Sequence, residues 1–166
     1  MYQLYEMNIS HQRNIERIEE RIFRTSIKNI GAKQLYDIGE TLELYNEGFN
    51  DTEQALFTNA LNKDIRKINQ DGGDLAYLQQ LEGIDLLYYE HIWQIENLLI
   101  DISSRSISNN DIHSIATIMK KHSDSFREIF YEEGISPEEF NTEENIDRIT
   151  NILVQLNKDI EMVLDR

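Results

Sequence analysis

The sequence has no cysteine, a single proline and only seven glycines among its 166 residues. The absence of cysteine excludes disulfide bonds, thiolate nucleophiles and cysteine-based zinc sites. The scarcity of glycine and proline favours long helices, because a many-stranded sheet needs a turn about every 8–12 residues. No stretch approaches the ~18 consecutive apolar residues of a membrane span, and no apolar run opens the chain. We therefore expect a cytoplasmic protein with no membrane segment.

Charge is abundant but unevenly distributed, with a net charge of −15. Residues 1–36 carry six bases and four acids, a net of +2, whereas residues 37–166 carry ten bases and 27 acids, a net of −17. Such an acidic body repels nucleic acid and anionic lipid. We therefore expect a protein partner that is itself basic, and we do not expect the protein to bind nucleic acid.

Apolar residues recur at helical spacing along almost the whole chain, and no segment alternates long enough to predict a strand. We predict an all-α fold, an irregular bundle of five or six helices that forms a single domain over residues 1–166. Its first part is a basic N-terminal helix at about residues 9–30. The acidic helical remainder covers residues 33–166.

Glycines and capping patterns set the expected helix boundaries. Gly31 either ends the first helix or is only a weak point in one long helix. Gly48 ends the second helix, and the QDGGD segment at 70–74 ends the third. Capping boxes at Asn50/Glu53 and Ser136/Glu139 mark helix starts. The remaining helices are expected at about 74–102, at 110–133 before Gly134, and from 142 onwards.

The segment LLYYEHIWQIENLLID (86–101) is apolar on two faces of one helix. The first face carries Tyr88, Ile92, Ile95, Leu99 and Ile102. A helix of this kind must be covered on two sides, so it is either the central helix of the bundle or an interface with another chain. Tryptophan and tyrosine give large contact area at small entropic cost. The second face supplies our candidate protein-binding residues: Leu86, Tyr89, Trp93 and Ile100.

None of the four histidines stands in a metal-binding spacing, since Glu-x-x-His and His-Glu-x-x-His are both absent. His91 lies inside the first apolar face, and Glu90 and Glu96 point about 100° and 140° away from it around the helix. We therefore expect His91 and His122 to be buried, neutral and hydrogen-bonded. The sequence predicts no catalytic residue, no metal and no cofactor.

Acidic residues form two patterns on the expected helices. An acidic face on the second helix carries Asp37, Glu40, Glu43 and Glu47, and the Glu82/Asp85 pair follows later. Carboxylate pairs on neighbouring helices can hold Mg²⁺ against nucleotide phosphates. The arrangement is loosely similar to that of all-α nucleoside triphosphate pyrophosphohydrolases, which use Glu-x-x-Glu followed by Glu-x-x-Asp. That resemblance implies an Mg²⁺-dependent nucleotide hydrolase, although the 38 residues between Glu43 and Glu82 exceed the spacing usual in that family.

The first helix carries a basic face made of Arg13, Arg17, Arg21, Arg24 and Lys28. Intervening glutamates dilute it, and no aromatic residues interleave with it to stack on bases. We interpret it as a solvated face, or as a face that docks on an acidic surface of this chain or of a second copy.

Taken together, the sequence predicts an acidic helical protein-binding module, an inhibitor or neutraliser of a basic partner such as an immunity, antitoxin or anti-defence protein. Two alternatives stay open: the Mg²⁺-dependent nucleotide hydrolase, and a structural homodimeric adaptor.

Overall fold

The computed structural model describes residues 2–82, 88–104, 107–136, 139 and 142–164. For some helical residues in these ranges only the backbone is described, namely 2–6, 8, 19, 21–28, 75, 78–82, 88–89 and 103–104. The described chain contains six α-helices, two π-helical segments and no strand. The predicted all-α bundle is therefore confirmed.

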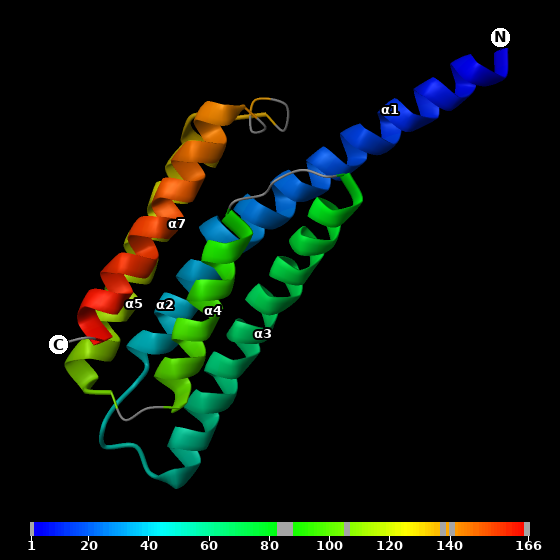
Figure 1. Cartoon of the computed structure of the whole chain (residues 1–166). Helices are drawn as coiled ribbons and strands as arrows, with labels where there is room; N and C mark the ends of the chain where they lie inside the picture. Colours follow the sequence, from blue (N-terminus) through cyan, green and yellow to red (C-terminus); the bar gives the residue numbers. More distant parts are fainter. Residues whose placement is uncertain (1, 83–87, 105–106, 137–138, 140–141, 165–166) are drawn as a thin grey trace.

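The N-terminal part is one long helical rod made of α1 (Tyr2–Phe23), the π-helical segment η1 (Arg24–Gln34) and α2 (Leu35–Glu43). Figure 1 shows the first half of α1 extending beyond the rest of the bundle. The predicted helix start near residue 9 is wrong. Gly31 lies inside the rod, so the alternative of one long helix is the correct one. A methyl group at Gly31 would overlap the ring of Phe126, so glycine serves the close approach of another helix there.

The end of α2 and the start of the next helix are set by local hydrogen bonds. The prediction that the second helix runs to Gly48 is wrong, because α2 ends at Glu43 and the backbone N–H of Leu44 turns back to the carbonyl of Thr41. The predicted capping box is confirmed. Asn50 Oδ1 accepts the backbone N–H of Glu53 at 3.0 Å, and Glu53 Oε2 accepts that of Asn50 at 2.9 Å.

The helix α3 (Asp51–Glu82) passes through the QDGGD segment without a break, so the predicted break there is wrong. The predicted helix over 74–102 is wrong too, because α4 (Tyr88–Ser104) lies beside α3 and antiparallel to it. A Cβ at Gly72 would stand 3.3 Å from Ile92 Cγ2. A glycine costs about 1 kcal/mol in a helix interior. Burial of α4 against the glycine-containing side of α3 offsets that cost.

The last three elements match the predicted boundaries closely. They are α5 (Asn109–Arg127), the π-helical segment η2 (Glu128–Glu132) and α7 (Glu143–Leu164). Gly134 has φ +68°, the left-handed conformation that closes a helix and favours glycine. The second capping box is also confirmed, since Ser136 Oγ accepts the backbone N–H of Glu139 and Glu139 Oε2 accepts that of Ser136.

The helices surround a single apolar core. In space α2 packs on α3, α3 on α4, α4 on α7, α7 on α5, and α5 back on α2 and η1. The core residues follow the predicted stripes, among them Leu35, Ile38, Leu61, Ile95 and Leu156, all fully buried. No helix in the described ranges is long and apolar enough to cross a membrane.

Candidate functional site

The two apolar faces of α4 have different environments. The first face is in the core, since Ile92, Ile95, Leu99 and Ile102 are at most 4% exposed. On the second face Trp93 is 56% exposed and Ile100 is 45% exposed. The interpretation of α4 as a central helix covered on both sides is therefore wrong for this part of the face. Leu86 lies outside the described residues, and of Tyr89 only the backbone is described.

A groove of about 180 Å³ lies beside the Trp93 side chain, between α3 and α4. Its walls include Gly72 and Gly73, and a Cβ at Gly73 would meet no atom within 4 Å. Tyr77, one turn further along α3, is 61% exposed. We call Gly73, Tyr77, Trp93, Ile100 and this groove the Trp93 surface. Sequence reasoning found Trp93 but missed the glycines, which it treated as a helix break.

Polar residues border the Trp93 surface. Glu96 accepts a hydrogen bond from Asn69 across the groove, and Glu90 is exposed. His91 is only half-buried, so its predicted burial is wrong. Its Nδ1 lies 3.2 Å from Gln94 Oε1, and its backbone carbonyl accepts a hydrogen bond from Asn157. These contacts make His91 part of the seam between α4 and α7.

His122 is 4% exposed and hydrogen-bonded, as predicted. Its Nε2 lies 2.8 Å from Asp159 Oδ2, which joins α5 to α7. Burial raises the pKa of Asp159, but hydrogen bonds from His122 and Gln155 and the nearby charges of His122 and Lys121 outweigh it, so the pKa lies below its usual value. The sequence could not supply this partner, because the two residues are far apart along the chain.

The predicted acidic face turns towards α5 and is bonded to it. Lys120 donates hydrogen bonds to Glu40 and, at 2.7 Å, to Glu43, and Glu47 accepts the backbone N–H of Asn109 at 2.6 Å. The bonds to Glu40 and Glu43 raise the pKa of Lys120, and the bond from Lys120 lowers the pKa of Glu40. Asp37 is half-buried on the same helix. The placement of Glu47 on the second helix is wrong, because α2 ends at Glu43. Glu40 and Glu43 attach α2 to α5.

The backbone of α3 places residue 82 far along the bundle from Glu40 and Glu43. Asp85 and the side chain of Glu82 lie outside the described residues, but the backbone of α3 fixes its register on α2. Thr41, which stands between Glu40 and Glu43, donates a hydrogen bond to Asp64. Residue 82 follows Asp64 by 18 positions on α3, which at ~1.5 Å per residue is about 27 Å along the bundle. In the described part of the chain no cluster of His, Asp or Glu residues could hold a metal ion.

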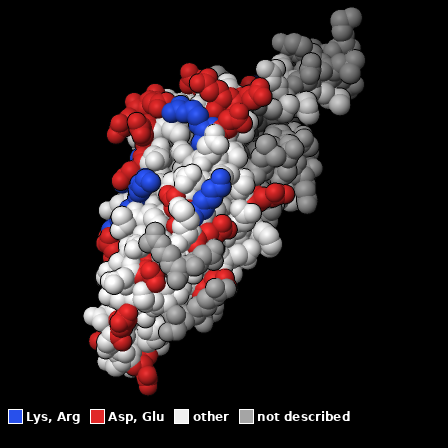
Figure 2. Space-filling view, turned by 60° about the vertical axis from the view of Figure 1, so that its left-hand side comes forward, with Lys and Arg blue, Asp and Glu red and all other residues white. Residues whose placement is uncertain are grey.

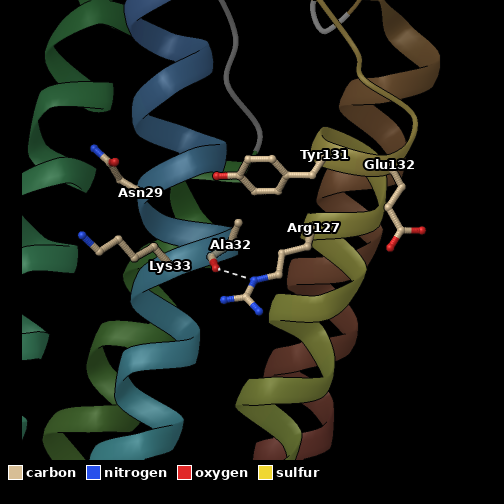
Figure 3. A pocket seen from close by; sticks show the side chains of 6 residues that line it. All are labelled: Asn29, Ala32, Lys33, Arg127, Tyr131 and Glu132. Carbon is tan, nitrogen blue, oxygen red and sulfur yellow. Dashed lines mark hydrogen bonds between the residues drawn. The ribbon is translucent and has the colours of Figure 1, made fainter.

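A second cavity, of about 610 Å³, lies between η1 and η2 and was missed by sequence reasoning. Figure 3 shows Arg127 and Tyr131 pointing from α5 and η2 towards η1, while Glu132 points away from the gap. Arg127 Nε donates a hydrogen bond to the carbonyl of Ala32 at 3.1 Å, and its guanidinium lies 4.5 Å from the Tyr36 ring centroid. No sequence pattern could have placed these residues together, because nearly 100 positions separate Ala32 from Arg127.

The basic face of α1 is described only in part. Arg13 and Arg17 are exposed, and the side chains of Arg21, Arg24 and Lys28 lie outside the described ones. Acidic side chains are spread over much of the surface, and Figure 2 shows them gathering at the end of the bundle where α7 begins.

The fold defines a helical-bundle protein of the all-α class. No known protein family, no curated protein and no solved structure matches the chain.

Proposed function

We propose that this protein is an acidic protein-binding module that inhibits or neutralises a basic partner protein, and that it binds this partner through the Trp93 surface. The observation that carries the proposal is the 56% exposure of Trp93, the only tryptophan, beside a groove between α3 and α4. Large exposed aromatic side chains beside a cavity are typical anchors of protein interfaces, and single anchors can contribute ~2 kcal/mol or more.

The shape of the Trp93 surface supports a docked segment of polypeptide. The glycines of α3 leave a shallow channel where other residues would place side chains. Trp93 lines this channel from α4, and Tyr77 follows Gly73 by one turn on α3; both aromatic residues are more than half exposed. A partner side chain that enters the groove would cover the indole and complete the packing that α4 lacks on this face.

The charge of the chain supports a basic partner. The net charge is −15, and the exposed Glu90 together with Glu96 keeps acidic groups beside the Trp93 surface. Complementary charge accelerates the encounter of two proteins and suppresses wrong partners. The predicted acidic face on α2 plays no part in this proposal, because Glu40, Glu43 and Glu47 are bonded to α5. A cytoplasmic location is part of the proposal and agrees with the absence of cysteine.

The experiment starts by capturing the partner from the producing cells on immobilised wild-type protein and identifying it by mass spectrometry. The purified partner is then titrated with wild type, Trp93→Ala and Met162→Ala. Met162 is the matched control, since it is 55% exposed on α7, away from the groove. We expect Trp93→Ala to weaken binding by about 30-fold or more, the equivalent of ~2 kcal/mol. Met162→Ala should bind like the wild type.

Two results would overturn the proposal. The first is a Trp93→Ala variant that binds the partner as tightly as the wild type does. The second is a Trp93→Ala variant that loses cooperative unfolding in urea, which would make Trp93 a structural residue. Sedimentation of the wild type and the variant tests the homodimeric adaptor: a dimer that Trp93→Ala converts to a monomer would identify a second copy as the occupant of the surface.

A further inference from the structure

We propose a second binding site, in the cavity between η1 and η2, for a small molecule that carries a phosphate or carboxylate group next to a planar ring. The cavity of about 610 Å³ is within the usual size of small-molecule sites, and it shares no lining residue with the groove beside Trp93. The inference is therefore independent of the protein-binding proposal.

The positive side chains of the cavity give the site its preference for anions. Lys33 and Arg127 both line it, in a chain that has 16 basic residues against 31 acidic ones. Lys33 is exposed and has no ion-pair partner among the described residues, and Figure 3 shows its ammonium directed away from Arg127. Its flexible stem would have to turn towards the cavity to contact a bound anion.

Arg127 is held in place before any ligand arrives. Its Nε donates to the Ala32 carbonyl, which also accepts a hydrogen bond from Ser123 Oγ at 3.1 Å, and its guanidinium lies over the ring of Tyr36. One Nη lies 3.7 Å from the exposed Asp124, a weak pair at the surface. The terminal nitrogens are therefore available for an anion. A guanidinium positioned in this way can bind phosphate or carboxylate in a bidentate manner.

The nearby acidic groups do not fill the cavity. One acidic residue, Glu132, lines the cavity, and Figure 3 shows its carboxylate directed away from η1. Glu133 is bound at 2.7 and 2.9 Å by Arg148 of α7. Tyr131 projects its ring into the gap and is 58% exposed, so its face can stack on a planar ring of the ligand.

The backbone conformation on both sides of the cavity also supports a ligand site. Both walls are π-helical, since η1 covers 24–34 and η2 covers 128–132. π-Helical turns are rare and occur frequently at functional sites. Two such segments face each other across this cavity, which agrees with the proposed site.

The test uses phenyl phosphate, benzoate and inorganic phosphate as probes at constant ionic strength, with binding followed by amide shifts in NMR and by calorimetry. We expect phenyl phosphate or benzoate to shift amides within 29–33 and 127–132, and we expect inorganic phosphate to bind more weakly because it lacks a ring. The ratio of the dissociation constants of phenyl phosphate and benzoate shows whether the site prefers phosphate or carboxylate.

Matched variants assign the binding to the cavity. Lys33→Gln should weaken the binding of phenyl phosphate by about tenfold, which corresponds to the loss of one charge-assisted hydrogen bond. Lys63→Gln, which removes an exposed lysine of α3 outside the cavity, should have no effect. Tyr131→Ala should remove the advantage of phenyl phosphate over inorganic phosphate. Trp93→Ala should leave probe binding unchanged whether or not it affects the protein partner.

Three results would overturn the site. They are the absence of binding by every probe at millimolar concentration, shifts spread over the whole surface, and equal weakening by Lys33→Gln and Lys63→Gln.

Discussion

His122 Nε2 and Asp159 Oδ2 lie 2.8 Å apart inside the bundle and connect α5 to α7. Asp159 also accepts a hydrogen bond from Gln155 at 2.6 Å, and its side chain is 14% exposed. The carboxylate therefore accepts hydrogen bonds from one buried donor, His122, and one exposed donor, Gln155. Its ionised form is favoured in the folded protein, which makes this pair a source of pH-dependent stability.

We predict that Asp159→Asn destabilises the protein at neutral pH by about 1–3 kcal/mol, the usual effect of removing one partner of a buried polar contact. The pKa of Asp159 is lowered in the folded state, so its contribution is complete above the unfolded pKa and is lost as pH falls through the lower, folded value. Urea unfolding of both proteins between pH 7 and pH 3 checks this. The difference between the two proteins should begin to shrink as pH falls below about 4. A difference that is constant over this range would exclude the titration of Asp159 as its cause.

The substitution of glycine by alanine should change stability in opposite directions at Gly31 and at Gly73. Gly31→Ala should destabilise the protein by about 1–3 kcal/mol, because the added methyl group overlaps the Phe126 ring in a packed core. Gly73→Ala should stabilise it by about 0.4–1 kcal/mol, because the methyl group meets no atom and alanine restricts the unfolded chain. Urea unfolding of both variants provides the measurement. Equal effects of the two substitutions would contradict the tight approach of α5 to η1.

The seam between α4 and α7 contains a buried amide. Asn157 is 4% exposed, and its Nδ2 donates to the His91 carbonyl and to Gln94 Oε1, each at 3.1 Å. Asn157→Asp removes both donors and buries a charge, so we expect a loss of about 2–4 kcal/mol in unfolding free energy at pH 7. Asn151→Asp, on the exposed side of α7, is the control and should change stability by less than about 0.5 kcal/mol. Similar losses in the two variants would argue against the seam contact.

The repeat of apolar residues was sufficient to predict the fold class and most of the core. Each helix buries one face against the same interior, so spacing alone identified residues such as Ile95 and Leu99. The capping boxes were equally predictable, because Asn50 and Glu53 interact within one turn. These features depend on residues that are close together in the sequence.

Features that depend on distant residues were not predictable. From the sequence, Gly72 and Gly73 indicated a helix break, because the sequence does not show that α4 packs beside them. The same limit applies to the cavity between η1 and η2. Its two walls are nearly 100 residues apart, and no local pattern distinguishes a π-helical turn from an α-helical one. Trp93 was identified as a candidate protein-binding residue, but the spacing left open whether its side chain lies in the core or on the surface.

Ionic strength should affect how fast the partner binds more than how fast it leaves. The chain carries a net charge of −15, and interactions between exposed charges are screened beyond about 8 Å at ~0.15 M salt. We therefore expect the association rate to fall at least tenfold between ~0.02 and ~0.5 M salt, with little change in dissociation. Surface plasmon resonance at several salt concentrations measures both rates. An association rate that does not depend on salt would contradict charge steering and favour an interface that is apolar only.

Trp93 provides a direct reporter of its own surface, because it is the only tryptophan in the chain. With 56% of its side chain exposed, its fluorescence should be quenched by acrylamide nearly as strongly in the folded protein as in urea. Acrylamide is the appropriate quencher, since iodide is repelled by the acidic body. Saturation with the partner should shift the emission to shorter wavelength and protect Trp93, because water leaves the indole. Saturation with phenyl phosphate should do neither, since its cavity lies between η1 and η2. Protection that depends on the concentration of the protein alone would show that a second copy covers the Trp93 surface.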